Sequence, residues 1–382
     1  MDLFGTNFLS NNLMLPILDF FYGVVPSYGL AIVALTLVVR AALAPVSAGQ
    51  IRNMRQMKVA QPVMQKRVRE IQERYKNDPA KQQEEMAKVY QEFGNPLAGC
   101  LPLILQLPIL FALFATLRGS PFADVSYPVE LEIVPREQVV QSQPFYSQSH
   151  NIYVKPGLHY PITAVSTAGN KLRVGDETVL DFRTPDGRSL SSIIQEVNNP
   201  DLTPHWTVKN GADLVELITT ESGETKLKAL QPGKVSLVGV IPGLAANEGF
   251  LFISALGQVG VVDSKGMIHW DTVILVLIFA TSTYVSQMIT SQGDLIKNPQ
   301  QEQVNKSLPL ILAVMFLFFP LPAGVLMYMV IANIFQTVQT FILSREPLPE
   351  HLQKIVDEQK KTLAAQAETL PFERNRPKKK TG

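Results

Sequence analysis

The stretch that decides the fold reads Tyr28-Gly-Leu-Ala-Ile-Val-Ala-Leu-Thr-Leu-Val-Val-Arg-Ala-Ala-Leu-Ala-Pro-Val46, and its single charged residue is Arg40. Runs of about 17–25 apolar residues match the roughly 30 Å hydrocarbon core of a bilayer. Three further stretches, 97–117, 272–290 and 308–343, contain no Asp, Glu, Lys or Arg. The last is too long for one span and is interrupted by Pro320-Leu-Pro-Ala-Gly324, which predicts a tight hairpin of two helices. The sequence therefore predicts five membrane spans.

Lys and Arg near the span ends set the expected orientation, because basic loops stay in the cytoplasm. The loop 47–96 has ten Lys/Arg against six Asp/Glu, and the tail 344–382 has nine against six. The segment 118–271 has twelve against seventeen, and the first 27 residues have no Lys or Arg. We therefore expect the N-terminus and the segment 118–271 outside, and the C-terminus in the cytoplasm.

The chain divides into ten expected segments. They are an outer interfacial amphipathic helix (1–27), a first span (28–46), a cytoplasmic helical hairpin (47–96), a second span (97–117), an extracytoplasmic β-rich domain (118–270), a third span (271–290), a cytoplasmic loop (291–307), a fourth and a fifth span (308–320 and 323–343) and a basic cytoplasmic tail (344–382). The expected fold class is an all-α membrane core of five spans with an inserted β-sandwich-like domain.

After Pro45 the sequence becomes basic and rich in methionine. Apolar residues recur there at helical spacing on one face, namely Met54, Met57, Met64, Val68, Ile71 and Tyr75. In the turn Asn77-Asp-Pro79, Asp78 suits a helix N-cap and Pro79 the first helical position. We predict a two-helix hairpin, with a solvated linker as the alternative. Met54, Met57, Met64 and Tyr75 are its candidate substrate-receiving residues, because methionine repacks around varied apolar partners.

Segment 121–268 differs in style, since short β-branched runs alternate with turn residues. Examples are Thr178-Val-Leu-Asp-Phe182, Thr184-Pro-Asp-Gly187, Lys209-Asn-Gly211 and Val235-Ser-Leu-Val-Gly-Val240. Strands at this spacing favour a β-sandwich, and Asn-Gly and Pro-Asp-Gly between apolar runs are hairpin and turn signals. We expect a domain that folds on its own, and we expect that replacing 124–266 with a short Gly/Ser linker leaves the function of the membrane core largely intact.

Catalysis is not expected. All five histidines lie outside the predicted spans, and no carboxylate lies within one, so an intramembrane protease or a proton relay lacks its titratable groups. The sequence shows no phosphate-binding glycine loop, zinc-ligand spacing or nucleophile elbow. We therefore expect no enzyme activity, no metal and no cofactor. Leu97-Ala-Gly-Cys100 mimics a lipoprotein cleavage site, but a packing cysteine at the start of a span is the better interpretation.

The spans carry one cation and several amides and hydroxyls. Arg40 costs about 2.5–3.5 kcal/mol at the centre of a span on insertion scales. The candidate groove residues are Arg40, Thr36, Gln106, Thr283, Gln287, Asn333 and Gln336, several of them at three- or four-residue spacing. An arginine that reaches the headgroups and polar contacts that only join helices are the alternatives. Because the spans contain no carboxylate, we expect water or an incoming anion to solvate the Arg40 guanidinium.

The same residues resemble the YidC/Oxa/Alb family of membrane insertases. The resemblance is carried by Gly29 to Arg40 followed by Pro45, by Gly94-Asn-Pro-Leu-Ala-Gly-Cys-Leu-Pro-Leu-Ile-Leu-Gln-Leu-Pro-Ile109, and by Phe319-Pro-Leu-Pro-Ala-Gly-Val-Leu-Met-Tyr328 followed by Asn333. It covers about 1–120 and 268–345. It departs from the family at Met329, where an aromatic residue is common, and in the β domain, since the long domain of many members lies earlier in the chain.

The resemblance implies a five-helix core with a groove that is open to the cytoplasm and the lipid and closed outside. In this family the arginine matching Arg40 attracts acidic or polar parts of a nascent membrane protein, and a polar residue at the place of Gln106 faces the groove. The resemblance also implies the Sec translocon as a partner, the ribosome through the basic tail 374–380, no specific nucleic-acid sequence, and a bacterial inner membrane or a thylakoid membrane as location. An anion channel that uses the same arginine is the alternative, and a structural anchor for the β domain is a third.

Overall fold

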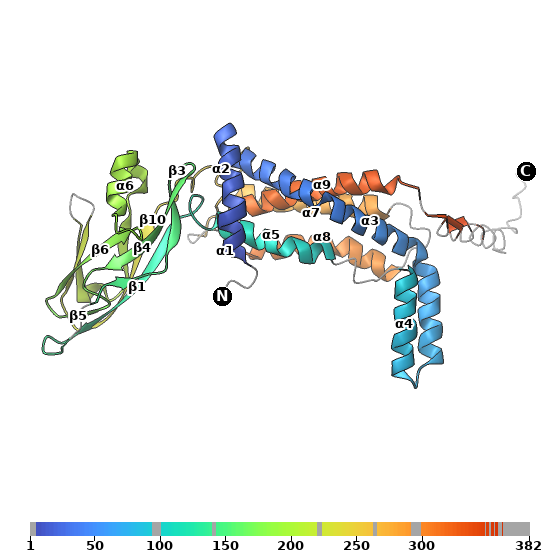
Figure 1. The fold of residues 1–382 in the computed structure, drawn as a ribbon, viewed down its shortest axis with the longest axis horizontal. Helices are drawn as coiled ribbons and strands as arrows, with labels where there is room; N and C mark the ends of the chain where they lie inside the picture. Colours follow the sequence, from blue (N-terminus) through green and yellow to red (C-terminus); the bar gives the residue numbers. More distant parts are fainter. Residues whose placement is uncertain are drawn as a thin grey trace, which may run out of the picture. The chain divides into compact units, whose positions relative to one another are not determined.

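The structure is a computed structural model. It describes residues 5–93, 101–139, 143–219, 224–262, 266–291 and 299–347, together with 349–350, 353–354, 356–357 and 361, so Cys100 and the basic stretch 374–380 lie outside the described residues. The chain forms two compact units, whose elements are labelled in Figure 1. The first comprises Met1–Val38, Leu107–Leu277 and Val314–Ile331. The second comprises Val39–Gln106, Ile278–Ala313 and Ala332–Gly382.

The stretches predicted as membrane spans form helices. Among the described residues, three helical stretches are long and apolar enough to cross a membrane, namely Tyr28–Ala60, Trp270–Ile289 and Ala323–Ser344. Two shorter apolar helices cover Leu105–Leu117 and Ser307–Phe318. The chain is therefore an integral membrane protein. The count of five spans stays a prediction, since two of the five helices are short and the predicted second span begins among residues that the structure does not describe.

Helix α3 (Tyr28–Arg74) is continuous across the predicted boundary between the first span and the hairpin. The change at residues 46 and 47 is one of side-chain character and not a break in the backbone. Proline inside a helix usually disrupts its hydrogen bonds. Two carbonyl groups beside Pro45 also accept hydrogen bonds from side chains, since Ser47 Oγ donates to the Leu43 oxygen at 3.0 Å and Gln339 Nε2 donates to the Ala44 oxygen at 2.9 Å.

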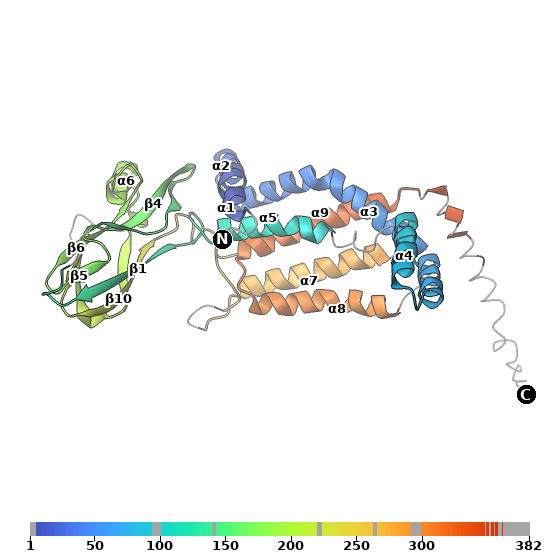
Figure 2. The same ribbon diagram turned by 60° about the horizontal axis from the view of Figure 1, so that its bottom comes forward.

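Helix α4 (Pro79–Phe93) forms the second arm of the hairpin, and Figures 1 and 2 both show it alongside the C-terminal part of α3. The predicted cap is confirmed, since the Lys81 amide donates to Asp78 Oδ1 at 3.2 Å and Pro79 is the first helical residue. Such a cap satisfies one of the amides that a helix N-terminus leaves without an internal partner.

The remaining helices made of apolar stretches are α5 (Leu101–Leu117), α7 (Trp270–Ser291), α8 (Pro299–Phe318) and α9 (Ala323–Ser344). The predicted break around Pro320 and Pro322 separates α8 from α9. The predicted cytoplasmic loop 291–307 is in part helical, because α8 already begins at Pro299. Proline suits the first helical position, and the Gln and Glu residues that follow are good helix formers.

The N-terminal segment, predicted as an amphipathic helix over 1–27, is helical from Thr6 to Val24. It consists of α1 (Thr6–Leu9), a π-helical turn (Ser10–Met14) and α2 (Leu15–Val24). The Ser10 and Thr116 hydroxyls share a buried hydrogen bond of 2.7 Å, which joins this segment to α5. Its location in the membrane interface stays a prediction.

Ten strands form two sheets in the described part of the β-rich domain. They are β1 (Val125–Val134), β2 (Phe145–Tyr146), β3 (His150–Lys155), β4 (Leu158–Ser166), β5 (Lys171–Arg173), β6 (Glu177–Arg183), β7 (His205–Asn210), β8 (Val215–Thr219), β9 (Thr225–Ala229) and β10 (Gly233–Ile241). One sheet has the order β5-β1-β10-β7. The other has the order β2-β4-β6-β9-β8, with β3 paired to β4. The β-rich character of the insertion is thus confirmed.

The two sheets contribute to one apolar core. Strand β1 alternates buried and exposed residues over most of its length, which is the period-two pattern of a strand with one buried face. Leu131 and Leu237 from the first sheet and Leu180 and Leu227 from the second belong to the same buried cluster. This shared core gives the domain a means of folding that is separate from the membrane helices.

One local prediction in this domain was wrong in part. Asn210-Gly211 forms a turn but does not join a hairpin, because β7 and β8 belong to different sheets and a short 3₁₀ turn (Ala212–Leu214) separates them. Gly211 is still required, since its φ of 79° lies in the left-handed region. The sequence also gave no warning of helix α6 (Leu190–Val197), which buries Leu190, Ile193 and Ile194.

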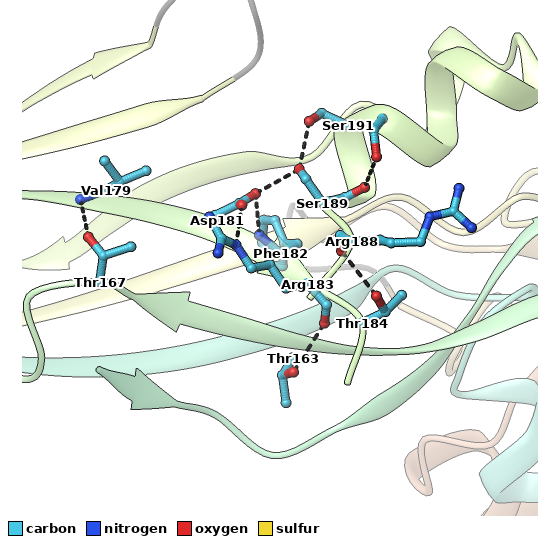
Figure 3. Close-up of polar contacts among 11 residues, drawn as sticks. Thr163, Thr167, Val179, Asp181, Phe182, Arg183, Thr184, Arg188, Ser189 and Ser191 are labelled. Carbon is cyan, nitrogen blue, oxygen red and sulfur yellow. Dashed lines mark hydrogen bonds and ion pairs between the residues drawn. The ribbon is translucent and has the colours of Figure 1, made fainter. Parts of the chain in front are cut away.

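Polar contacts at the start of α6 attach it to strand β6 (Figure 3). Ser189 Oγ donates to Asp181 Oδ1 at 3.1 Å and shares a hydrogen bond of 2.7 Å with Ser191. Arg183 Nε donates to Asp181 Oδ2 at 2.7 Å. The carboxylate of Asp181 thus organises the entry to the helix, which explains why three apolar residues suffice to fix so short an element.

A segment after the last strand, residues 242–269, binds the connection between α8 and α9 through its backbone. The Gly324 amide donates to the Leu256 oxygen and the Ala323 amide to the Gln258 oxygen, both at 2.8 Å. The Gly260 amide donates to the Leu321 oxygen at 3.0 Å. We call residues 256–260 the clasp. The predicted domain 118–270 therefore ends its strands at Ile241, and its last part is bonded to the membrane helices.

Candidate functional site

Arg40 lies on α3 and directs its guanidinium at helix α9. Its Nη1 donates to Gln336 Oε1 at 3.1 Å, and the arginine is half-buried. Both residues were predicted as groove residues, and the structure brings them together. A charge at this depth is costly unless polar groups or water solvate it. The neutral amide of Gln336 solvates one nitrogen and leaves the positive charge of Arg40 in place.

A second polar contact joins α9 to α7. Asn333 Nδ2 donates to Ser282 Oγ at 2.9 Å and to Thr283 Oγ1 at 3.0 Å. These hydroxyls in turn donate to the Phe279 carbonyl oxygen. Asn333 and Thr283 were predicted to share the site. Because Asn333 and Gln336 are three residues apart on α9, one face of that helix carries both polar contacts.

Further along α3 and α9 the polar contacts continue. Ser47 Oγ donates to Gln339 Oε1 at 3.0 Å. Ser47, Gln339 and Ser282 were not predicted, although the signal was present, since Ser47 lies two helical turns after Arg40 and Gln339 three residues after Gln336. We call the following residues the polar cluster: Arg40, Ser47, Ser282, Thr283, Gln287, Asn333, Gln336 and Gln339.

Gln287 on α7 has a buried side-chain oxygen, Oε1, for which the described part of the chain provides no hydrogen-bond partner. A buried polar atom in this state costs free energy unless water or a ligand satisfies it. Gln287 therefore marks a place in the polar cluster where an external donor would be stabilised.

The other two predicted groove residues behave differently. Thr36 is fully buried, and its hydroxyl donates to the Ile32 oxygen one turn earlier at 2.6 Å, so its own helix satisfies it. Gln106 on α5 is half-buried. Their participation in a groove stays a prediction.

The C-terminal end of α9 is bound by two arginines of α3. Arg52 donates through Nε and Nη2 to the two carboxylate oxygens of Glu346, each at 2.8 Å, and this lowers the pKa of Glu346. Arg55 Nη1 donates to the Leu343 oxygen at 3.2 Å and to the Glu346 oxygen. Cations at this end of a helix satisfy its last carbonyl groups and complement its dipole.

The candidate receiving residues Met54, Met57, Met64 and Tyr75 are all half-buried. Ala60 on α3 and Val89 on α4 are buried, with exposed fractions of 1% and 5%. The role of the four candidate residues as receiving residues stays a prediction.

Comparison with known proteins identifies the family. A family model described as "60Kd inner membrane protein" matches residues 20–165 and 236–350, which is more than half of the chain. The chain belongs to this family, the YidC/Oxa/Alb family. The residues left out of the match, 166–235, hold strands β5 to β9 and helix α6. The apolar helices and strands β1 to β4 and β10 are thus the part that the YidC/Oxa/Alb family model describes.

Some relatives within the YidC/Oxa/Alb family resemble the chain over almost its whole length, and others over a part of it. A protein named membrane protein insertase YidC from Thermosynechococcus vestitus is 58% identical over 97% of this chain and 95% of its own length. A protein of the same name from Synechocystis is 54% identical over 99% of this chain and 98% of its own length. A third, from Chlorobaculum parvum, is 43% identical over 28% of this chain and 18% of its own length.

Proposed function

We propose that this protein inserts and folds other membrane proteins without catalysing a chemical reaction. The names of its relatives support this, since those that match nearly the full chain are called membrane protein insertases. The observation that carries the mechanism is the polar cluster, in which α3, α7 and α9 exchange side-chain hydrogen bonds around Arg40.

The mechanism is a substitution of polar partners. A polar segment that crosses bare hydrocarbon leaves hydrogen-bonding groups unsatisfied, at several kcal/mol each. A groove lined by the polar cluster, with Thr36 and Gln106 along its course, offers replacement partners. Arg40 supplies a transient counter-charge to acidic residues of the substrate, and the oxygen of Gln287 accepts a hydrogen bond. Release follows when the apolar helix of the substrate partitions into lipid.

The proposed orientation follows from the charges of the loops. The N-terminal helix and the β domain, with its two sheets packed as a sandwich, lie outside, and the hairpin and the tail lie in the cytoplasm of a bacterial inner membrane or face the corresponding side of a thylakoid membrane. The hairpin would receive nascent chains. The Sec translocon would bind laterally, and the basic tail would strengthen association with ribosomes.

Substitution of Arg40 tests the mechanism in proteoliposomes. A charge pair of this kind is worth about 1–4 kcal/mol, so Arg40→Ala and Arg40→Glu should lower insertion of a single-span substrate with an acidic translocated tail by about fivefold or more, while Arg40→Lys should retain much of it. The matched control is the same substrate with its acidic residues changed to Asn and Gln, which should be less sensitive. Normal insertion by Arg40→Glu would overturn the role of the charge.

The same vesicles separate insertion from anion conduction. Chloride efflux is measured before substrate is added. Efflux that depends on Arg40, together with no insertion in any variant, would favour the channel. Insertion without efflux is the expected result.

A further inference from the structure

A tight turn between the β domain and α7 carries two apolar residues at its tip. The Phe250 amide donates to the Ile253 oxygen, and the Ile253 amide donates to the Phe250 oxygen, both at 2.9 Å. The two central residues of this turn are Leu251 and Phe252, whose exposed fractions are 84% and 45%. We call Leu251 and Phe252 the apolar tip.

The backbone of the apolar tip is unusual for its sequence. Leu251 has a φ of 55°, in the left-handed region, and Asn198 is the only other non-glycine residue with positive φ in the described part of the chain. A positive φ at the first central position alone is the pattern of a type II′ turn, where glycine is the usual residue. Leucine at this position adopts a strained backbone conformation, and its side chain is exposed. Strain of this kind is a reason to look for a function.

The residues that flank the tip hold it in place. The ring of Phe250 covers Gly29 in the first turn of α3, where an added Cβ would lie 2.1 Å from Phe250 Cγ. Ile253 is buried, and the Ser254 amide donates to Asp271 Oδ2 at 2.8 Å. The turn is thus attached to the first turns of α3 and α7. Phe250 and Ile253 anchor it, while Leu251 and Phe252 project.

The surface beside the tip is that of a membrane span. Helix α7 begins at Trp270, one residue before the Asp271 that binds the turn. Trp270, Ile274 and Leu277 are exposed by 67%, 44% and 59% and follow one another on one helical face. An exposed apolar face on a membrane-spanning helix is the face that meets lipid, and tryptophan is typical of the membrane interface. The tip therefore lies where a lipid-facing surface begins.

We propose that Leu251 and Phe252 insert into the interfacial layer of the bilayer on the side of the β domain and act as a lipid anchor. The ligand is the boundary between headgroups and acyl chains. Burial of two large apolar side chains there compensates for the strained backbone. The anchor would hold the neighbouring clasp at a constant depth while the membrane helices move. It does not depend on the role proposed for Arg40.

Depth-dependent fluorescence quenching tests the anchor in the full-length protein. In a Cys100→Ser background, Leu251→Cys carries an NBD label, and the protein is reconstituted in phosphatidylcholine/phosphatidylglycerol vesicles. The control is Val139→Cys in the same background, a residue that is 95% exposed and follows strand β1. Lipids with a nitroxide near the headgroup should quench the label at 251 at least about twofold more than the label at 139, and aqueous iodide should show the reverse order.

Two results would overturn the proposal. Equal access of iodide to both labels would place the tip in water. Protection from iodide without quenching by lipid nitroxides would mean that the tip packs against protein, such as a second copy of the chain.

A second variant separates a loss of anchoring from a loss of folding. Leu251→Gly suits the turn, so its thermal midpoint in detergent should equal or exceed that of the parent. With the label on Phe252→Cys in both proteins, Leu251→Gly should lower quenching by the shallow lipid nitroxide about twofold, because it removes the anchoring side chain that the labelled parent still has. Unchanged quenching would show that Leu251 does not anchor the turn.

Discussion

Asp19 and Tyr153 are distant in sequence and meet in the first unit. The Tyr153 hydroxyl donates to Asp19 Oδ2 at 2.8 Å, and Tyr153 is fully buried. Burial raises the pKa of Asp19, while the bond from Tyr153 and the nearby His159 act in the opposite direction. The pKa of Tyr153 is raised as well, by burial and by the carboxylate. This one contact therefore joins helix α2 to strand β3 through an acid whose charge is only partly compensated.

Removal of either partner should have unequal effects on stability. Tyr153→Phe leaves the half-buried carboxylate without its donor and should lower the free energy of unfolding by about 1–3 kcal/mol at about pH 7. Asp19→Asn keeps an acceptor for the tyrosine and removes the buried charge, so its effect should be smaller. Thermal unfolding in detergent measures both. A larger loss for Asp19→Asn than for Tyr153→Phe would contradict this account.

The pH dependence of the same contact has a definite sign. Because folding raises the pKa of Asp19 above its ordinary value near 3.8, the folded state favours the protonated acid. The contribution of Asp19 to stability is therefore most favourable below the unfolded pKa and is lost as the pH rises through the folded pKa. As the pH is lowered from about 7 to about 4, the free energy of unfolding of the parent should rise relative to that of Asp19→Asn. A difference that does not vary with pH would contradict the raised pKa.

The hairpin of α3 and α4 has few buried side chains that hold its two arms together. Among the hairpin residues with described side chains, only Ala60 and Val89 are buried. The ion pair between Arg67 and Glu92 links the arms, but both side chains are about half exposed, and such pairs contribute little. Few buried contacts mean a low free energy of local opening. The arms can therefore separate and uncover their methionines.

Crosslinking tests whether the hairpin receives substrate. A photoreactive residue in place of Met57 or Met64 should crosslink to a nascent chain before insertion, because we expect these half-buried side chains to be uncovered at a seam that opens when the arms separate. Gln72 is the matched control, an exposed residue on the same helix. It should crosslink several-fold less under a seam-opening mechanism. Equal yields at Met57 and Gln72 would leave the hairpin a structural brace.

Features that depend on neighbouring residues could be predicted from the sequence, whereas contacts between residues far apart in the chain could not. Asp78 and Pro79 mark the start of α4 because a cap acts on its own helix. The bond that Gln339 donates to the Ala44 oxygen of α3 could not be predicted, since it joins two helices almost 300 residues apart. In the polar cluster, Arg40 was found as the one charged residue of the predicted spans, and Gln336 by its helical spacing from Asn333. Which helix faces which is set by packing, so Ser47 and Ser282 were missed.

At the scale of the whole molecule, the segment between α5 and α7 has two parts that pack against different structures. Strands β1 to β10 share one apolar core. The clasp, by contrast, forms backbone hydrogen bonds with Ala323, Gly324 and Leu321, and Gly324 leaves no room for a side chain, because an added Cβ would lie 2.8 Å from Leu117 Cδ1. The expected exchange of 124–266 for a linker would therefore remove part of the membrane core together with the domain.

The structure indicates a better boundary for deletion. Val125 and Ile241 are direct partners in the β1–β10 ladder, and cross-strand partners lie about 5 Å apart. A Gly/Ser linker of about two to four residues can thus replace 125–241 without moving the ends. Asp124 would still accept a hydrogen bond from the Gly243 amide through its side chain, at 3.0 Å.

Two deletions compared side by side test this division. The variant that lacks 125–241 should reach the membrane and insert a small single-span substrate within about twofold of the parent, because the polar cluster and the clasp are intact. The variant that lacks 124–266 loses three backbone hydrogen bonds to the α8–α9 connection, worth about 2–4 kcal/mol together, and should unfold at a lower temperature in detergent. Insertion in proteoliposomes and thermal unfolding are measured on both. If the shorter deletion folds and reaches the membrane yet inserts nothing, the β domain takes part in insertion itself. If both deletions are equally stable, the clasp is not part of the membrane core.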